Sequence, residues 1–135
     1  MSLGSWDPQA EQSTTDFHID SEVLHFFIGL SEHNQLDQLS TQLSAEQQQL
    51  QAKLMQLTKD DWFNVISPFS DEQLEHLICF FTLAEKLPGW EAGEKSPVIW
   101  LGKMLKQRGT GINRDLVLWI KANSSNQYLP HGPLL

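Results

Sequence analysis

The stretch LDQLSTQLSAEQQQLQAKLMQL, residues 36–57, places a leucine at every seventh position, with two further leucines between these. The six leucines are Leu36, Leu39, Leu43, Leu50, Leu54 and Leu57. In a helix with 3.6 residues per turn they all fall within an arc of about 60°, narrower than the apolar stripe of about 100° on an ordinary core-facing helix. The spacing therefore predicts one long helix over residues 35–57 whose leucine seam requires a partner.

A short apolar helix is predicted before this seam, over residues 22–31, with Ser21 as its N-cap. Its apolar residues cover most of the circumference, so we expect it to be buried on nearly all sides. The short polar turn that follows favours an antiparallel hairpin. The first helix would span about 15 Å and the second about 34 Å. The hairpin therefore leaves Leu50, Leu54 and Leu57 to be covered by something else.

Two interpretations of the leucine seam remain open, packing within one chain and a coiled coil between two chains. Glu46 and Gln47 interrupt the seam midway between Leu43 and Leu50. A zipper that binds DNA also needs a basic helix before its heptads. No lysine or arginine precedes Lys53, so the sequence excludes the DNA-binding form of zipper.

Start and stop signals predict further helices after the seam. Thr58 with Asp61 has the spacing of a capping box, as does Ser70 with Gln73. Pro97 follows a serine, which is a strong start signal. The expected helices run from Thr58 to before Pro68, and over 71–86, 97–108 and 114–122. The helix over 71–86 is expected to be the centre of the core.

We therefore predict an all-α fold with an N-terminal helical hairpin that contains one long helix, a compact bundle of about four helices and an extended C-terminal tail. The hairpin covers residues 21–57, and the bundle with its tail, docked as a strap, covers 58–135. Residues 1–20 form a flexible arm, and 21–135 form one cooperative domain.

Composition and charge restrict the functional classes. The 135 residues include 40% hydrophobic residues, which is typical of a globular protein, and no apolar run is long enough to cross a membrane. A single cysteine cannot form an intramolecular disulfide, so we expect a cytoplasmic location. Residues 1–52 carry eight acidic and no basic residues, whereas 95–135 carry six basic and one acidic residue. No cofactor is indicated.

The basic third of the chain raises an alternative function, nucleic-acid binding. Its candidate residues are Lys103, Lys106, Arg108, Arg114 and Lys121. A helix that reads DNA needs polar residues near its start, but the last helix continues after Arg114 and Asp115 with five apolar residues. Few basic residues in an acidic chain argue against this alternative. The acidic half could instead imitate nucleic-acid charge and bind a basic protein.

Motifs for metal binding or catalysis are weak. Glu22 with His25 and His76 with Cys79 have helical spacing, but a di-metal centre needs more such pairs and carboxylates. The pair Asp60-Asp61 fits the first turn of a helix. No nucleophile motif or phosphate-binding loop occurs, so we expect no enzyme activity.

The sequence thus predicts a protein–protein interaction module, with a homodimer through the leucine seam as its most concrete form and another protein as the alternative partner. Trp90, in a loop rich in glycine and proline, is a further candidate because tryptophan often anchors interfaces. It would equally fit as a plug that closes one end of the core. The candidate interaction residues are Leu50, Leu54, Leu57 and Trp90.

Overall fold

The computed structural model describes residues 19–124, 126 and 129, and in this part of the chain the fold is all-α, as predicted. The α-helices are α1 (Ser21–Glu32), α2 (Leu39–Gln42), α3 (Ala45–Gln51), α4 (Lys59–Ile66), α5 (Asp71–Ala84), α6 (Pro97–Gln107) and α7 (Arg114–Asn123). Short 3₁₀ helices cover Leu36–Gln38, Ala52–Gln56 and Gly93–Lys95. Among the described helices, none is long and apolar enough to span a membrane.

The helices begin where their caps predict. Thr58 and Ser70 each take part in a complete capping box, at α4 and α5. The Ser96 side chain accepts a hydrogen bond from the main-chain N–H of Val98, the second residue of α6. The prediction was wrong by one residue at α1, where Asp20 rather than Ser21 is the N-cap, because the Asp20 carboxylate accepts the N–H of Glu22.

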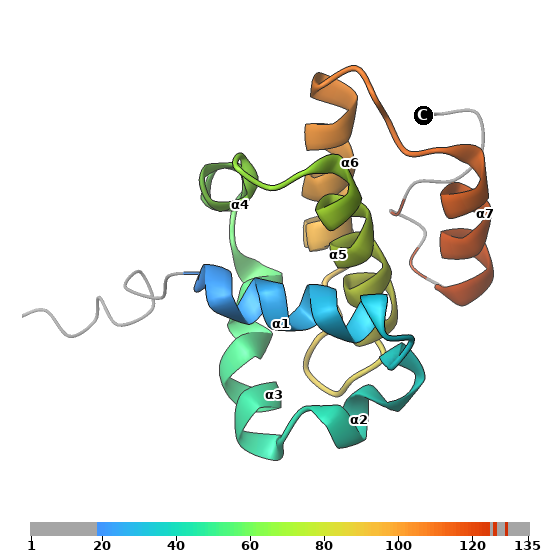
Figure 1. Ribbon diagram of the computed structural model, residues 1–135. Helices are drawn as coiled ribbons and strands as arrows, with labels where there is room; N and C mark the ends of the chain where they lie inside the picture. Colours follow the sequence, from blue (N-terminus) through green and yellow to red (C-terminus); the bar gives the residue numbers. More distant parts are fainter. Residues whose placement is uncertain (1–18, 125, 127–128, 130–135) are drawn as a thin grey trace, which may run out of the picture.

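Helix α5 is the centre of the core, as predicted, and packs against α1, α6 and α7 (Figure 1). Phe27 of α1 stacks on Phe80 of α5 with ring centroids 3.9 Å apart. Trp62 of α4 meets Phe81 of α5 edge to face at 5.4 Å. The described buried side chains form one cluster, so the N-terminal helices share a core with the rest of the bundle.

The long helix predicted over 35–57 is absent, and the segment turns at its middle instead. Leu43 has an extended backbone with ψ 127°, and Ser44 begins α3 as an N-cap. The Ser44 side chain accepts the main-chain N–H of Gln47, and the Gln47 side chain accepts the N–H of Ser44. This capping box supplies hydrogen bonds that a continuous helix would not need. The predicted hairpin is corrected as well, because α1 makes its main contact with α5.

Side-chain hydrogen bonds hold this bent segment against the bundle. The Gln48 amide donates to the main-chain oxygens of Leu43, at 2.9 Å, and Ser40, at 3.3 Å, and so bridges α2 and α3. The indole N–H of Trp90 donates to the main-chain oxygen of Gln48 at 2.9 Å. That of Trp62 donates to the main-chain oxygen of Leu54 at 3.3 Å. Helix α3 is therefore fixed to Trp90, and the 3₁₀ helix that follows it is fixed to Trp62.

Part of the predicted C-terminal strap lies within the described residues. The Asn126 amide donates to Glu85 Oε1 and to the main-chain oxygen of Gly93, both at 3.0 Å. The Leu129 side chain is buried. These contacts fasten the chain after α7 to the end of α5 and to the loop that follows it. The rest of the tail, and the predicted arm up to residue 18, lie outside the described residues.

Candidate interaction surface

The four predicted interaction residues occupy different environments. Leu50 is 50% exposed, but Leu54 and Trp90 are fully buried in the core. Leu57 is partly buried and packs against the core. The ring of Trp90 meets Phe80 inside the bundle. This contact favours the interpretation of Trp90 as a residue that closes the core over its interpretation as an interface anchor. Only Leu50 presents a large part of its side chain to a partner.

The bend at Ser44 explains why Leu50 is exposed while the other leucines are not. Leu39 and Leu43 precede the bend and are buried. The 3₁₀ helix after α3 has a tighter turn than an α-helix, and it directs both Leu54 and Met55 into the core. The other leucines of the seam are buried in the chain's own core or pack against it, and Leu50 remains on the outer side of α3. It lies in an open depression lined also by Glu46, Gln47, Gln49 and Lys53.

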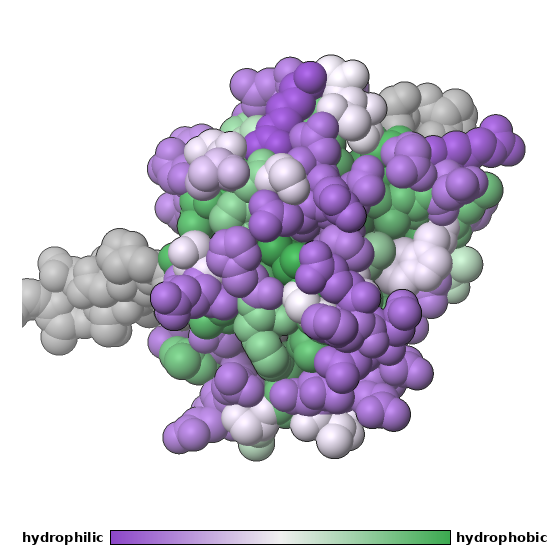
Figure 2. All heavy atoms as spheres, viewed as in Figure 1, coloured by the Kyte–Doolittle hydropathy of each residue, from purple (hydrophilic) through white to green (hydrophobic). Residues whose placement is uncertain are grey.

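A groove of about 180 Å³ lies next to Leu50, between α1 and α3. Phe27 and Leu43, both buried, and the partly buried Val23 form apolar parts of its lining. Gln47 lines both this groove and the depression around Leu50, so the two hollows are neighbours. Figure 2 shows apolar surface among hydrophilic residues over this region of α1 and α3.

Phe26 also lines this groove and is 42% exposed. The sequence analysis expected its helix to be buried on nearly all sides, and this expectation was wrong for Phe26. The signal was present in the spacing, since Phe26 follows Glu22 by one helical turn and so shares a face with a charged residue. Phe26 and Leu50 are two of the three large hydrophobic side chains exposed in the described part of the chain.

Carboxylates lie close to both apolar side chains, although Lys53 also lines the depression around Leu50. Asp20 and Glu22 line the groove beside Phe26, and Glu46 lines the depression beside Leu50. Residues 19–52 contain five acidic and no basic residues. We call the surface formed by Phe26, Leu50, Asp20, Glu22 and Glu46 the acidic face. It combines apolar anchors with a negative rim, an arrangement suited to a protein partner that carries both apolar and basic groups.

The predicted nucleic-acid residues are divided between α6 with its C-cap and α7. Lys103 and Lys106 are exposed on α6, whereas Arg114 and Lys121 are exposed on α7. Arg108 is used inside the fold, because its guanidinium donates to Asp71 Oδ1 at 2.8 Å and to the main-chain oxygen of Ser67 at 2.9 Å. This network links the end of α6 to the junction of α4 and α5.

Three residues considered for metal binding or catalysis, His25, His76 and Cys79, lie against other residues of the fold. His76 Nδ1 lies 2.8 Å from the Ser31 hydroxyl, and the His25 ring lies against Phe69. Burial raises the pKa of the Cys79 thiol to about 11, which disfavours a reactive thiolate. Within residues 19–124, 126 and 129, no three His, Cys, Asp or Glu side chains are placed to hold a metal ion.

The chain matches no protein-family model, no curated protein and no solved structure. Its proposed function therefore rests on its own residues and geometry.

Proposed function

We propose that this chain is a small helical protein–protein interaction module that associates with itself through the acidic face and has no catalytic role. The observation that carries the proposal is that two large apolar side chains are exposed at hollows that share Gln47 in their linings, Phe26 in the groove between α1 and α3 and Leu50 in the depression on α3. Contiguous exposed apolar surface rimmed by polar residues is typical of binding sites. Leu54 and Trp90 are left out of the proposed contact because both are buried.

The expected affinity is modest. Full burial of a leucine or phenylalanine side chain contributes about 1.5–3 kcal/mol, and both residues are already about half covered in the single chain. A specific interface also buries at least about 1,000 Å², which requires the groove walls as well as the two side chains. We therefore propose an association that depends on protein concentration. The single cysteine supports a cytoplasmic setting for it.

The charge of the acidic face favours one second candidate function, the binding of a different protein with a basic surface. Residues 19–52 contain no lysine or arginine, and Lys53, which lines the depression beside Leu50, offsets only one of the three carboxylates of the face. A lysine-rich amphipathic peptide serves as a probe for this candidate. Saturable binding to the wild-type chain, and loss of binding in Leu50→Glu, would favour it.

Self-association is tested by sedimentation velocity over a range of protein concentrations. Leu50→Glu places a charge where the proposed contact needs an apolar group, and Asn64→Asp adds the same charge to an exposed site on α4. We expect the wild type and Asn64→Asp to associate and Leu50→Glu to remain monomeric, with unchanged circular dichroism in all three. A wild type that stays monomeric at every concentration, or a Leu50→Glu variant that associates like the wild type, would remove the proposal.

A further inference from the structure

The third large exposed hydrophobic side chain of the described chain is Leu118, on α7, with 51% of its surface exposed. Arg114 precedes it by four residues and Lys121 follows it by three, and both are exposed. These intervals place all three side chains on one face of the helix. We call this surface the α7 face. The exposed Asp115 also neighbours Leu118, so the α7 face has two basic side chains and one acidic side chain. The acidic face has three carboxylates beside Lys53. Each face therefore has an apolar anchor, and their net charges are opposite.

We propose that the α7 face of one molecule docks on the acidic face of a second copy of the same chain. This inference rests on the proposed function and specifies the partner. Leu118 would pack beside Phe26 and Leu50, while Arg114 and Lys121 would lie opposite the carboxylates of the acidic face.

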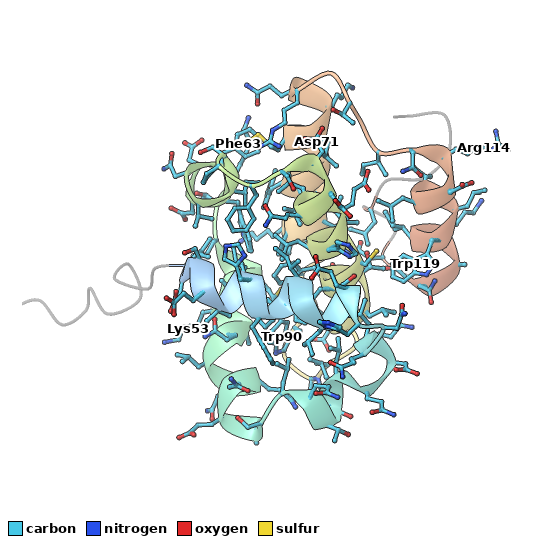
Figure 3. The ribbon with its side chains drawn as sticks, viewed as in Figure 1. Lys53, Phe63, Asp71, Trp90, Arg114 and Trp119 are labelled. Carbon is cyan, nitrogen blue, oxygen red and sulfur yellow. The ribbon has the colours of Figure 1, made fainter. Side chains whose placement is uncertain are left out.

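The two faces cannot satisfy each other within one molecule. Figure 1 shows α7 on the opposite side of the bundle from α3. Figure 3 likewise labels Lys53, just after α3, and Arg114, at the start of α7, on opposite sides. The contact must therefore form between molecules.

A symmetric dimer through the acidic face alone is disfavoured by charge. A two-fold interface brings the same surface of both subunits together, which here would place Asp20, Glu22 and Glu46 against their own copies. Like charges brought together at an interface oppose association. Docking of the α7 face replaces this repulsion with attraction, so the head-to-tail contact is the one that the charges favour.

A head-to-tail contact leaves one free acidic face and one free α7 face at the two ends of every assembly. Unless the rotation between copies closes a ring, the wild type should therefore form chains whose average mass rises steadily with concentration. Because the contact joins exposed opposite charges, added salt should weaken it. A symmetric dimer would instead stop at twice the monomer mass of 15.4 kDa.

The decisive experiment is complementation between two variants. Leu50→Glu alters the acidic face and keeps the α7 face, whereas Leu118→Glu alters the α7 face and keeps the acidic face. Both substitutions are at half-exposed positions, and circular dichroism checks that each variant is folded. We expect each variant alone to be monomeric in sedimentation velocity. An equimolar mixture should form a one-to-one dimer that grows no further and dissociates at high salt.

The other outcomes separate the two proposals. If Leu118→Glu associates like the wild type while Leu50→Glu does not, the head-to-tail contact is overturned and self-association through the acidic face stands. A mixture that stays monomeric overturns the head-to-tail contact in the same way. If Leu50→Glu also associates like the wild type, or the wild type is monomeric at every concentration, both proposals fail.

Discussion

The indole N–H of Trp90 donates a 2.9 Å hydrogen bond to the main-chain oxygen of Gln48, 42 residues earlier in the chain. Helix α3 has only seven residues, and a helix this short is not stable by itself in water. Its position therefore depends on such tertiary contacts. Because α3 also carries Leu50, the buried tryptophan supports the proposed interaction surface without being part of it.

Trp90→Phe should destabilise the protein and loosen α3. The substitution keeps an aromatic ring but removes the donor to Gln48, and loss of one hydrogen bond costs about 0.5–1.5 kcal/mol. Urea denaturation measures the total loss of stability. Hydrogen exchange should show faster exchange of the α3 amides, with smaller changes in α6.

Trp100→Phe provides the matched control. The indole nitrogen of Trp100 is buried and has no hydrogen-bond partner in the described structure. Its removal takes away an unsatisfied donor, so the loss of stability should be smaller than for Trp90→Phe. Equal losses in the two variants would mean that ring size, rather than the bond to Gln48, determines the effect.

Ser44→Ala tests the bend between α2 and α3 by the sign of its effect. Loss of an N-cap side chain costs about 0.5–2 kcal/mol, so the bent structure predicts destabilisation. In a continuous helix the same change would stabilise by a few tenths of a kcal/mol, since alanine is the better helix former. Ser40→Ala, inside α2, is the control and should be close to neutral. A more stable Ser44→Ala variant, measured by urea denaturation, would argue for the continuous helix.

Asp71→Asn should lower stability at neutral pH and make stability less sensitive to acid. The hydrogen bond from Arg108, with a second from Thr110, lowers the pKa of Asp71 below its ordinary value of 3.8. The ionised carboxylate therefore stabilises the fold above pH 3.8, and this contribution is lost as the pH falls through the lowered pKa. The difference in urea midpoint between wild type and variant should be constant near neutral pH and shrink below pH 3.8.

The control for this effect is Asp60→Asn, which removes the same charge from the first turn of α4. Both carboxylates interact with a helix N-terminus, but the structure pairs only Asp71 with an arginine. The loss at neutral pH should therefore be larger for Asp71→Asn. Equal losses would assign the effect to the helix dipole rather than to Arg108.

Glu85 should have the opposite dependence on pH. Burial raises the pKa of its carboxyl above the ordinary value of 4.5, against the lowering effect of the hydrogen bonds from Ser96 and Asn126. The folded protein thus holds this proton more tightly than the unfolded chain, which gives stability below pH 4.5 that is lost as the pH rises through the raised pKa. Glu85→Gln should therefore gain in urea midpoint relative to wild type as the pH rises from 4.5. A difference that does not vary with pH would contradict the raised pKa.

The sequence predicted the parts of the fold that short-range chemistry decides. Thr58, Ser70 and Ser96 all cap helices as their spacing indicated, because a cap depends only on the next few residues. The leucine repeat predicted the wrong structure for residues 35–57. The rule that a cap depends on the next few residues would have predicted the start of α3 in this stretch. Ser44 and Gln47 have the spacing of a capping box, and this local signal prevailed over the periodicity of the leucines.

The candidate surface was harder to predict, since exposure depends on how elements pack. Leu50 was identified, but Phe26 and Leu118 were grouped with buried neighbours because their helices are apolar overall. Each lies one turn after a charged residue, Glu22 and Arg114 respectively, and that spacing marks the outer side of a helix. Trp90 makes its hydrogen bond with a residue 42 positions earlier in the chain, and no local pattern reveals such a contact.

The bonds from Asn126 to Glu85 and Gly93 also set an order of events during protein synthesis. A ribosome synthesises α5 and the following loop before it adds residue 126 to the chain. Until then, Glu85 lacks one of the donors that satisfy its partly buried carboxylate in the finished fold. The loop from Glu85 to Ser96 therefore gains its last restraint only when the segment after α7 emerges.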